Sequence, residues 1–179
     1  MPVILPVEGA YPSLGKNCFI APNATIVGDV QMGNDCSIWF NAVVRGDVNS
    51  IRMGDKVNVQ DGAVIHCTYQ KTKTVIGNNV SIGHNAIVHG CTIEDNVLIG
   101  MGAIVMDNAY IGSHCIIAAG AVVLEGTQVP AGSIYAGVPA KKVKDTPDSL
   151  VNGEINRIAN NYIKYAGWFR DATNQAPER

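Results

Sequence analysis

Residues 76–123 read IGNNVSIGHNAIVHGCTIEDNVLIGMGAIVMDNAYIGSHCIIAAGAVV, and an aliphatic residue returns at almost every sixth position of this stretch. One step, from Val88 to Ile93, is five residues long. A glycine or another small or polar residue commonly follows the aliphatic one, and a small residue often lies four positions after it. This pattern is a hexapeptide repeat. The aliphatic positions, called rungs below, are Ile76, Ile82, Val88, Ile93, Ile99, Val105, Ile111, Ile117 and Val123.

The repeat extends in both directions and takes in most of the chain. A hexapeptide forms a short strand and a turn, so three of them make one triangular coil with the rungs inside. A period of six residues fits neither the roughly 3.6 nor the roughly 3.5 residues of helical patterns. We therefore predict an all-β fold, a single-stranded parallel β-helix over residues 1–144. The other rungs are Leu14, Ile20, Ile26, Met32, Ile38, Val44, Met53, Val59, Ile65, Val129 and Tyr135.

The C-terminal segment changes character at Asp145. Thr146 and Pro147 suit the cap and the first position of a helix. From Val151 to Phe169, apolar residues recur at three- and four-residue steps. This spacing predicts an α-helix of roughly five turns over residues 145–171, with its apolar stripe packed on the β-helix. Residues 172–179 are expected to form a loose tail.

Composition and charge restrict the classes of function. The 179 residues carry a formal net charge of −2, which gives no reason to expect nucleic acid or an acidic membrane as a partner. Hydrophobic residues make up 47% of the chain, but no run approaches the roughly 18 apolar residues of a membrane span. The chain opens without a basic region or a cleavage site, so we expect a cytoplasmic protein.

The five cysteines are an odd number in a chain without a secretion signal, which argues against a disulfide framework. Cys18, Cys36 and Cys115 each lie four residues after a rung, in the position that elsewhere takes Ala or Ser, so a structural role is expected for them. Cys67 and Cys91 depart from that pattern and lie close to His66 and His89. A metal or redox role stays open for these two, although no Cys-x-x-Cys spacing supports it.

Three of the four histidines, His66, His84 and His89, lie within 24 positions. If residues 65–76 are one rung step with a five-residue insertion, His66 and His89 each follow a rung on the same face, one coil apart. Backbones one coil apart are about 4.8 Å from each other, so both imidazoles could bind one ion. His84 would then point away and could complete the site of a neighbouring subunit. His114 lies apart in a turn and is expected to be solvated.

A second way of counting treats residues 65–76 as two hexapeptides that are short by one residue. That count stacks His84, rather than His89, over His66. Both counts gather histidines on one side of the β-helix. Three histidines with an open fourth position are the pattern of a catalytic rather than a structural zinc site.

The segments 44–47 (VRGD), 58–62 (NVQDG) and 83–90 (GHNAIVHG), together with His66, resemble the γ-class carbonic anhydrase family, and the resemblance covers about residues 10–170. It implies a left-handed parallel β-helix that forms a homotrimer with a zinc ion at each subunit interface. It also implies that His66 and His89 come from one chain and His84 from its neighbour. The further residues that it assigns to the site are Gln60 near the metal-bound solvent, Arg45, Asp47 and Asp61 in polar contacts of the interface, and Tyr162 from the C-terminal helix.

Other roles stay open for these further residues. Arg45, Asp47 and Asp61 could form a structural salt-bridge network that holds the trimer together. Tyr162 could be a core residue of the helix.

The activity implied by the resemblance is the reversible hydration of carbon dioxide to bicarbonate. Three neutral imidazoles leave the charge of zinc free to lower the pKa of its water to about 7, and the zinc-bound hydroxide attacks the carbon. Ferrous iron and cobalt also accept three imidazoles. No glutamate occurs between Glu8 and Glu94, so this chain lacks the acidic proton-shuttle loop of one branch and resembles the shorter branch.

Two other classes of function stay open. Residues 135–141 (YAGVPAK) resemble the end of the β-helix of coenzyme-A-dependent acyltransferases, and an acyltransferase or thioesterase-like enzyme would need only one general-base histidine. A metal-binding protein without hydratase activity is the third possibility. Stoichiometric metal without turnover would favour that third class.

Overall fold

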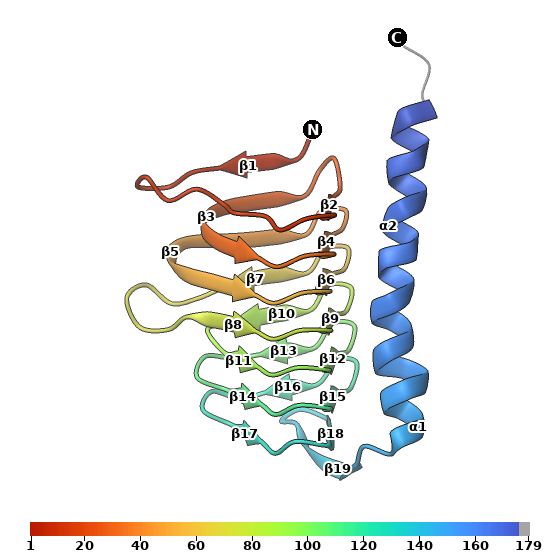
Figure 1. The fold of residues 1–179 in the computed structure, drawn as a ribbon. Coiled ribbons are helices and arrows are strands. Elements are labelled where there is room, and N and C mark those ends of the chain that lie inside the picture. The colour runs from red at the N-terminus through yellow and green to blue at the C-terminus, as the bar shows by residue number, and fades with distance from the viewer. Residues whose placement is uncertain (176–179) are drawn as a thin grey trace.

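The computed structural model describes residues 1–175, and of residues 170–175 it describes only the backbone. The chain winds into about seven coils of parallel strands, and a long helix stands beside them (Figure 1). The predicted fold class, a left-handed parallel β-helix with a C-terminal helix, is confirmed.

Each coil contributes to three faces. The first face contains β1 (Val3–Leu5), the first halves of β3 (Thr25–Met32) and β5 (Val43–Met53), β7 (Val64–His66), β10 (Ile87–His89), β13 (Ile104–Val105) and β16 (Val122–Val123). The second face contains the second halves of β3 and β5, β8 (Thr74–Ile76), β11 (Thr92–Ile93), β14 (Tyr110–Ile111) and β17 (Gln128–Val129). The third face contains β2 (Phe19–Ile20), β4 (Ser37–Ile38), β6 (Asn58–Val59), β9 (Ser81–Ile82), β12 (Leu98–Ile99), β15 (Ile116–Ile117) and β18 (Ser133–Ala136), and β19 (Lys141–Asp145) pairs antiparallel with β18.

The register of the strands confirms the rung pattern. Ile65 pairs with Val44 on one side and with Val88 on the other, whereas Ile76 pairs with Met53 and Ile93 on the next face. Residues 65–76 are therefore one rung step with an insertion, and the count that would stack His84 over His66 is wrong. Every rung from Ile26 to Val129 is buried, which places a continuous aliphatic core along the axis of the coils.

The corners of the coils use residues that tolerate left-handed backbone angles. Asn79, Asn96 and Asn108 have φ values of 57°, 58° and 58°. Asparagine is enriched in this region because its short side chain can hydrogen-bond locally. These asparagines thus let the chain turn sharply from one face into the next.

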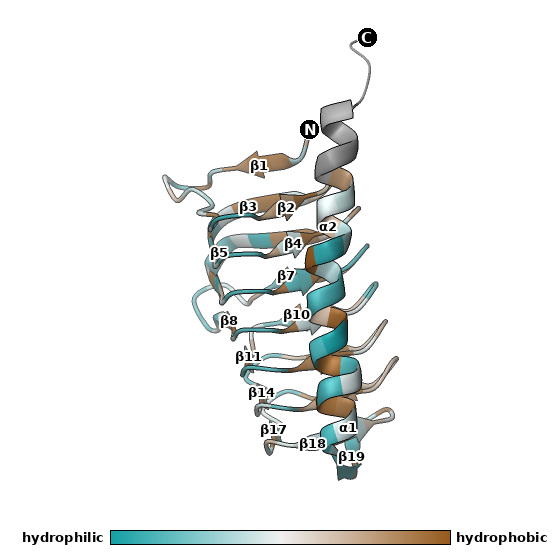
Figure 2. Ribbon diagram, turned by 45° about the vertical axis from the view of Figure 1, so that its right-hand side comes forward, coloured by the Kyte–Doolittle hydropathy of each residue, from teal (hydrophilic) through white to brown (hydrophobic). Residues whose placement is uncertain are grey.

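The C-terminal helix consists of α1 (Asp148–Leu150), the π-helical segment η1 (Val151–Asn156) and α2 (Arg157–Gln175). It runs back along the coils from β19 towards β2 (Figure 1; Figure 2 shows it from its outer side). The predicted apolar stripe does pack on the β-helix, since Ile155, Ala159 and Ala166 are buried. No helix in the described part of the chain is long and apolar enough to cross a membrane.

Both ends of this helix differ from the prediction. The N-cap is Pro147 rather than Thr146, with no side-chain hydrogen bond to the cap, so the helix begins at Asp148. At the other end the helical backbone continues to Gln175, four residues beyond the predicted end at Asp171. Part of the predicted loose tail is therefore helical, and residues 176–179 lie outside the described chain.

Candidate metal centre

His66 and His89 end two neighbouring strands of the first face, β7 and β10, and lie directly opposite each other in the register. Nδ1 of His66 is 3.2 Å from Nε2 of His89. The remaining nitrogen of each ring contacts a carboxylate: His66 Nε2 is 3.0 Å from Asp47 Oδ1, and His89 Nδ1 is 2.7 Å from Asp107 Oδ1. The predicted stacking of His66 and His89 is therefore confirmed.

The two facing nitrogens have the chemistry of metal ligands. An ionised carboxylate can only accept a hydrogen bond, so Asp47 and Asp107 each favour the proton on the ring nitrogen that they contact. The facing nitrogens then both carry lone pairs. Two nitrogens bound to one tetrahedral zinc ion at about 2.0–2.1 Å are roughly 3.3–3.4 Å apart. The observed 3.2 Å fits that separation, so this pair of residues fits a shared cation.

Asp47 is itself held by Arg45 on the same strand, through a short ion pair from Nη1 of Arg45 to Oδ2 of Asp47. Desolvation would raise the pKa of Asp47, but the hydrogen bonds from Arg45 and His66 outweigh it and hold that pKa below its usual value. Desolvation also lowers the pKa of His66, despite its contact with Asp47. Both shifts favour the neutral imidazole and the ionised carboxylate that a metal ligand and its support require.

Asp107, which follows β13 one coil beyond His89, is a site residue that the sequence reasoning missed. Besides His89, its carboxylate accepts hydrogen bonds from Thr68 Oγ1 at 2.6 Å and Thr72 Oγ1 at 3.2 Å. The signal available in the sequence was its position, two residues after the rung Val105, which pairs with Val88. The repeat does not predict, however, that Thr68 and Thr72 of the inserted loop contact this carboxylate.

The third predicted ligand, His84, lies at the opposite edge of the first face, in the turn between β9 and β10. Its Nδ1 is 3.0 Å from Asp61 Oδ2, and its Nε2 is 3.4 Å from the hydroxyl of Tyr162 on α2. The His84 side chain is 40% exposed, against 17% for His66. Asp61 thus contacts His84 as Asp47 contacts His66. Nε2 of His84 lies on the side of the ring that points away from Asp61.

Tyr162 is placed by the docking of α2 on the third face. Its ring packs edge-on against Trp39, with centroids 5.1 Å apart. Burial, followed by the negative charge of Asp61, raises the pKa of Tyr162 to about 12. Its hydroxyl therefore keeps its proton at physiological pH. Tyr162 therefore packs against Trp39 with its ring and also contacts His84 with its hydroxyl.

Gln60 is buried at the end of the third face, and its amide Nε2 donates to Asn58 Oδ1 at 3.0 Å. Asn58 in turn donates to Ser81 Oγ at 2.7 Å, so the amide of Gln60 is fixed by a short polar chain. A pocket of about 240 Å³ brings Gln60, His84 and Tyr162 together. The predicted residues thus form two clusters, one around His66 and His89 and one around His84.

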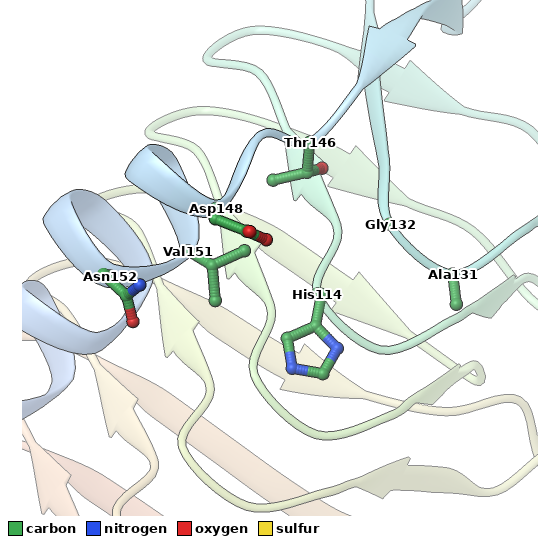
Figure 3. A pocket seen from close by; sticks show the side chains of 7 residues that line it. All are labelled: His114, Ala131, Gly132, Thr146, Asp148, Val151 and Asn152. Atoms are coloured by element: carbon green, nitrogen blue, oxygen red, sulfur yellow. The ribbon is translucent and has the colours of Figure 1, made fainter.

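The two clusters do not meet within one chain. Among residues 1–169, whose side chains the structure describes, no group of three or more His, Cys, Asp or Glu side chains is placed to hold a metal ion. A site with all three predicted ligands therefore needs a second chain. His114 belongs to neither cluster and is exposed in a separate hollow of about 570 Å³ near the start of the helix, with Thr146 and Asp148 (Figure 3).

Comparison with known proteins gives relatives over most of the chain. The pattern of the bacterial transferase hexapeptide family (six repeats) matches residues 11–46, 73–102 and 90–125. Gamma carbonic anhydrase 2, mitochondrial, of Arabidopsis thaliana is 40% identical over 160 residues, which cover 87% of this chain and 57% of the plant protein. This chain therefore spans little more than half the length of that relative.

Two further relatives match over nearly their whole length. The carbonic anhydrase of Geobacillus kaustophilus is 36% identical over 173 residues, which cover 97% of this chain and 94% of that protein. The crystal structure of a hexapeptide transferase family protein from Anaplasma phagocytophilum superimposes with a TM-score of 0.88 at 40% identity, over 93% of this chain and 98% of that one. The repeat, the coils and these relatives agree, and the chain belongs to the γ-class carbonic anhydrase-like family of hexapeptide-repeat proteins.

Proposed function

We propose that this protein catalyses the reversible hydration of carbon dioxide to bicarbonate at a zinc centre shared between subunits of a homotrimer. His66 and His89 of one subunit and His84 of the next would hold the metal. The observation that carries the proposal is the pair of facing ring nitrogens, 3.2 Å apart, with a carboxylate behind each ring. Relatives named carbonic anhydrase support the reaction.

A neighbouring subunit can supply the third ligand because the two clusters flank the same face. The first face also exposes apolar side chains, among them Ile87 in β10 and Met106 and Leu124, which directly follow β13 and β16; they are 38%, 38% and 48% exposed. Exposed apolar patches of this kind are typical of subunit interfaces. A closed threefold arrangement would bury all three copies of the face and bring His84 of each chain to the next chain's histidine pair.

When bound, zinc would supply the positive charge that lets a water molecule lose its proton near pH 7 and attack carbon dioxide. Three carboxylates of the chain would orient the histidine ligands. Asp47 and Asp107 contact the ring nitrogens of His66 and His89 that would not bind the metal, and so orient these two rings. Asp61 contacts Nδ1 of His84 in the same way. Ferrous iron or cobalt could take the place of zinc, since both accept imidazole nitrogen.

Substrate would lie beside the buried amide of Gln60 and the hydroxyl of Tyr162, which line the pocket next to His84. Both groups are uncharged at neutral pH, so they can orient an uncharged gas molecule and a bicarbonate product without trapping either. The side chain of Gln60 is fixed by Asn58, which makes it a pre-organised group rather than a mobile one.

The first test measures metal content and carbon dioxide hydration together. Protein purified without chelator, both in air and anaerobically, should contain about one metal per chain, as three ligands from two chains give one site per interface. His89→Ala should lose both metal and stopped-flow hydration. His114→Ala is the matched control, since His114 lies in a separate hollow, and it should keep both. Absence of metal from the wild type would refute the proposal.

Mixed trimers test the shared site directly. His84→Ala and His89→Ala chains should each be inactive alone. In a random one-to-one mixture of chains, three quarters of the trimers contain a single intact interface, so about a quarter of the wild-type sites should return. Failure of any activity or metal binding to return, in trimers shown to be mixed, would argue against a site between subunits.

A second candidate function is acyl transfer or thioester hydrolysis, and one observation favours it. An apolar hollow of about 270 Å³ lies between the third face and the helix, lined by Leu98, Ile116 and Ile158, and it includes Gln60. Such a hollow could take an acyl chain next to the His84 pocket. Cleavage of an acyl-coenzyme A by metal-free protein, lost in His84→Ala and kept in His89→Ala, would support this function over the hydratase. Metal without turnover of either substrate would leave a metal-binding protein.

A further inference from the structure

Asp107 is the only residue of the histidine clusters that accepts hydrogen bonds from three described side chains. Oδ2 accepts from Thr68 at 2.6 Å, while Oδ1 accepts from Thr72 at 3.2 Å and lies 2.7 Å from Nδ1 of His89. The side chain is 22% exposed, so the carboxylate is partly withdrawn from water. Both oxygens are thus occupied, and the direction in which the carboxylate faces His89 is fixed.

The loop that follows His66 is folded to make this arrangement. The backbone N–H of Thr68 donates to Thr72 Oγ1 at 2.9 Å, and the N–H of Thr72 donates to the carbonyl of Thr68 at 3.2 Å. The loop is also tied to the histidine strands, because Thr74 Oγ1 donates to the carbonyl of His66 at 2.7 Å and accepts from the N–H of Gly90 at 3.0 Å. The insertion in the repeat is therefore an ordered clamp.

The backbone at Gly90, beside this clamp, has no space for a side chain. At Gly90, an added Cβ would lie 1.9 Å from Asp107 Oδ1 and 2.2 Å from Thr72 Oγ1. A glycine at this position lets the carboxylate approach the residue directly after His89. The clamp, the glycine and the histidine thus form one fitted unit.

We infer that Asp107 is a positioning residue that fixes the tautomer and ring orientation of His89, with Thr68 and Thr72 of the inserted loop holding the carboxylate in place. This inference rests on the proposed metal centre, in which Nε2 of His89 is the ligating atom. A carboxylate that accepts a hydrogen bond from Nδ1–H leaves the lone pair of Nε2 free and makes this nitrogen more basic, and loss of such a partner typically weakens metal binding.

The tautomer can be read without any metal. In metal-free full-length protein labelled with ¹⁵N on histidine, at pH 8, two-bond proton–nitrogen correlations should show His89 protonated on Nδ1. Asp107→Ala should shift His89 towards the Nε2-protonated form that free imidazole side chains prefer. Asp107→Asn should keep the Nδ1–H form in large part, because the amide oxygen can accept the same hydrogen bond. Glu125→Gln, an exposed acidic position, is the control and should leave His89 unchanged.

Metal affinity gives the second readout. By competition with a chelator, Asp107→Ala should bind zinc about 10- to 100-fold more weakly than wild type, with Asp107→Asn in between, and the visible spectrum of the cobalt form should change. Thr68→Val with Thr72→Val should give a smaller loss in the same direction. A purely structural role would lower the melting temperature of metal-free protein while zinc affinity and tautomer stayed as in wild type.

The outcomes separate this inference from the proposed function. If wild type binds metal but does not hydrate carbon dioxide, the tautomer and affinity changes still test Asp107. If wild type binds no metal, the proposed function fails while the tautomer result stands on its own. A folded Asp107→Ala protein with His89 still protonated on Nδ1 would overturn the inference.

Discussion

Nδ1 of His66 and Nε2 of His89 are 3.2 Å apart although 23 residues separate them along the chain. Each ring is backed by a carboxylate on its far side, Asp47 for His66 and Asp107 for His89. In this arrangement two lone pairs face each other, which is unfavourable unless a cation or a shared proton lies between them.

Replacement of Gly90 by alanine should weaken both folding and metal binding. Its φ is +55°, and the new Cβ would collide with Asp107 and Thr72. Gly102 is a matched control, because its φ is +66° and nothing lies within 4 Å of an added Cβ. Gly102→Ala should cost only the left-handed strain of about 1–2 kcal/mol in the free energy of unfolding. Gly90→Ala should cost more and also lower zinc affinity, as measured by denaturation and chelator competition. Equal effects of both substitutions would show that the fit around Asp107 is unimportant.

The stability of the metal-free protein should fall in acid in two stages. The pKa of His66 is lowered in the folded state, chiefly by desolvation, so the unfolded chain takes up its proton first as pH falls below about 6.5. The pKa values of Asp47 and Asp107 are also lowered in the folded state, because their hydrogen bonds outweigh desolvation. Their contribution is present above the usual carboxyl pKa of about 4 and is lost below it.

Urea midpoints measured in metal-free protein between pH 8 and pH 3 check this prediction. His66→Gln should remove the first stage and leave most of the second. A midpoint for wild type that rises as the pH is lowered from 7 to 5 would contradict the sign of the His66 shift.

Tyr162→Phe should separate the contribution of the hydroxyl from that of the ring. The ring packs on Trp39 and would remain, so the free energy of unfolding should change by less than about 1 kcal/mol. The hydroxyl lies 3.4 Å from Nε2 of His84, and its loss should slow hydration by about tenfold without loss of metal. Tyr110→Phe, at an exposed position of β14 on the second face, is the control, and stopped-flow hydration is the measurement. Full activity in Tyr162→Phe would leave this residue with a packing role alone.

The cysteines should differ sharply in reactivity. A hydrogen bond from the Cys36 thiol lowers the pKa of Cys18 to about 7, whereas burial raises the pKa of Cys91 to about 12. At pH 7 iodoacetamide should therefore alkylate Cys18 roughly tenfold faster than an ordinary thiol, and Cys91 only after unfolding. Mass spectrometry of the modified peptides reads the result, and Cys18→Ser is the control. Rapid labelling of Cys91 in folded protein would show that the coil opens between β10 and β11.

The spacing of residues along the chain predicts the coils and one half of the site. Six-residue steps place each rung above another, because parallel strands pair in a fixed register and every rung must face the core. Of the two ways of counting those steps, one put His66 opposite His89 and the other put His84 there, and the register confirms the first. The same counting placed His84 at a different edge, and the apolar spacing after Asp145 indicated a helix on the outside of the coils.

Contacts that do not follow the repeat are seen only in the folded protein. Asp107 meets Thr68, which lies 39 residues earlier, because the inserted loop is free of the rung pattern and folds according to its own hydrogen bonds. Tyr162 meets His84 across 78 residues because packing of the helix on Trp39 sets how far along the coils each turn lies. The helix likewise continues to Gln175, although residues 172–175 carry no apolar spacing that would predict a helix there. Periodic burial can be read along a chain, whereas side-chain contacts between unrelated elements depend on how those elements dock.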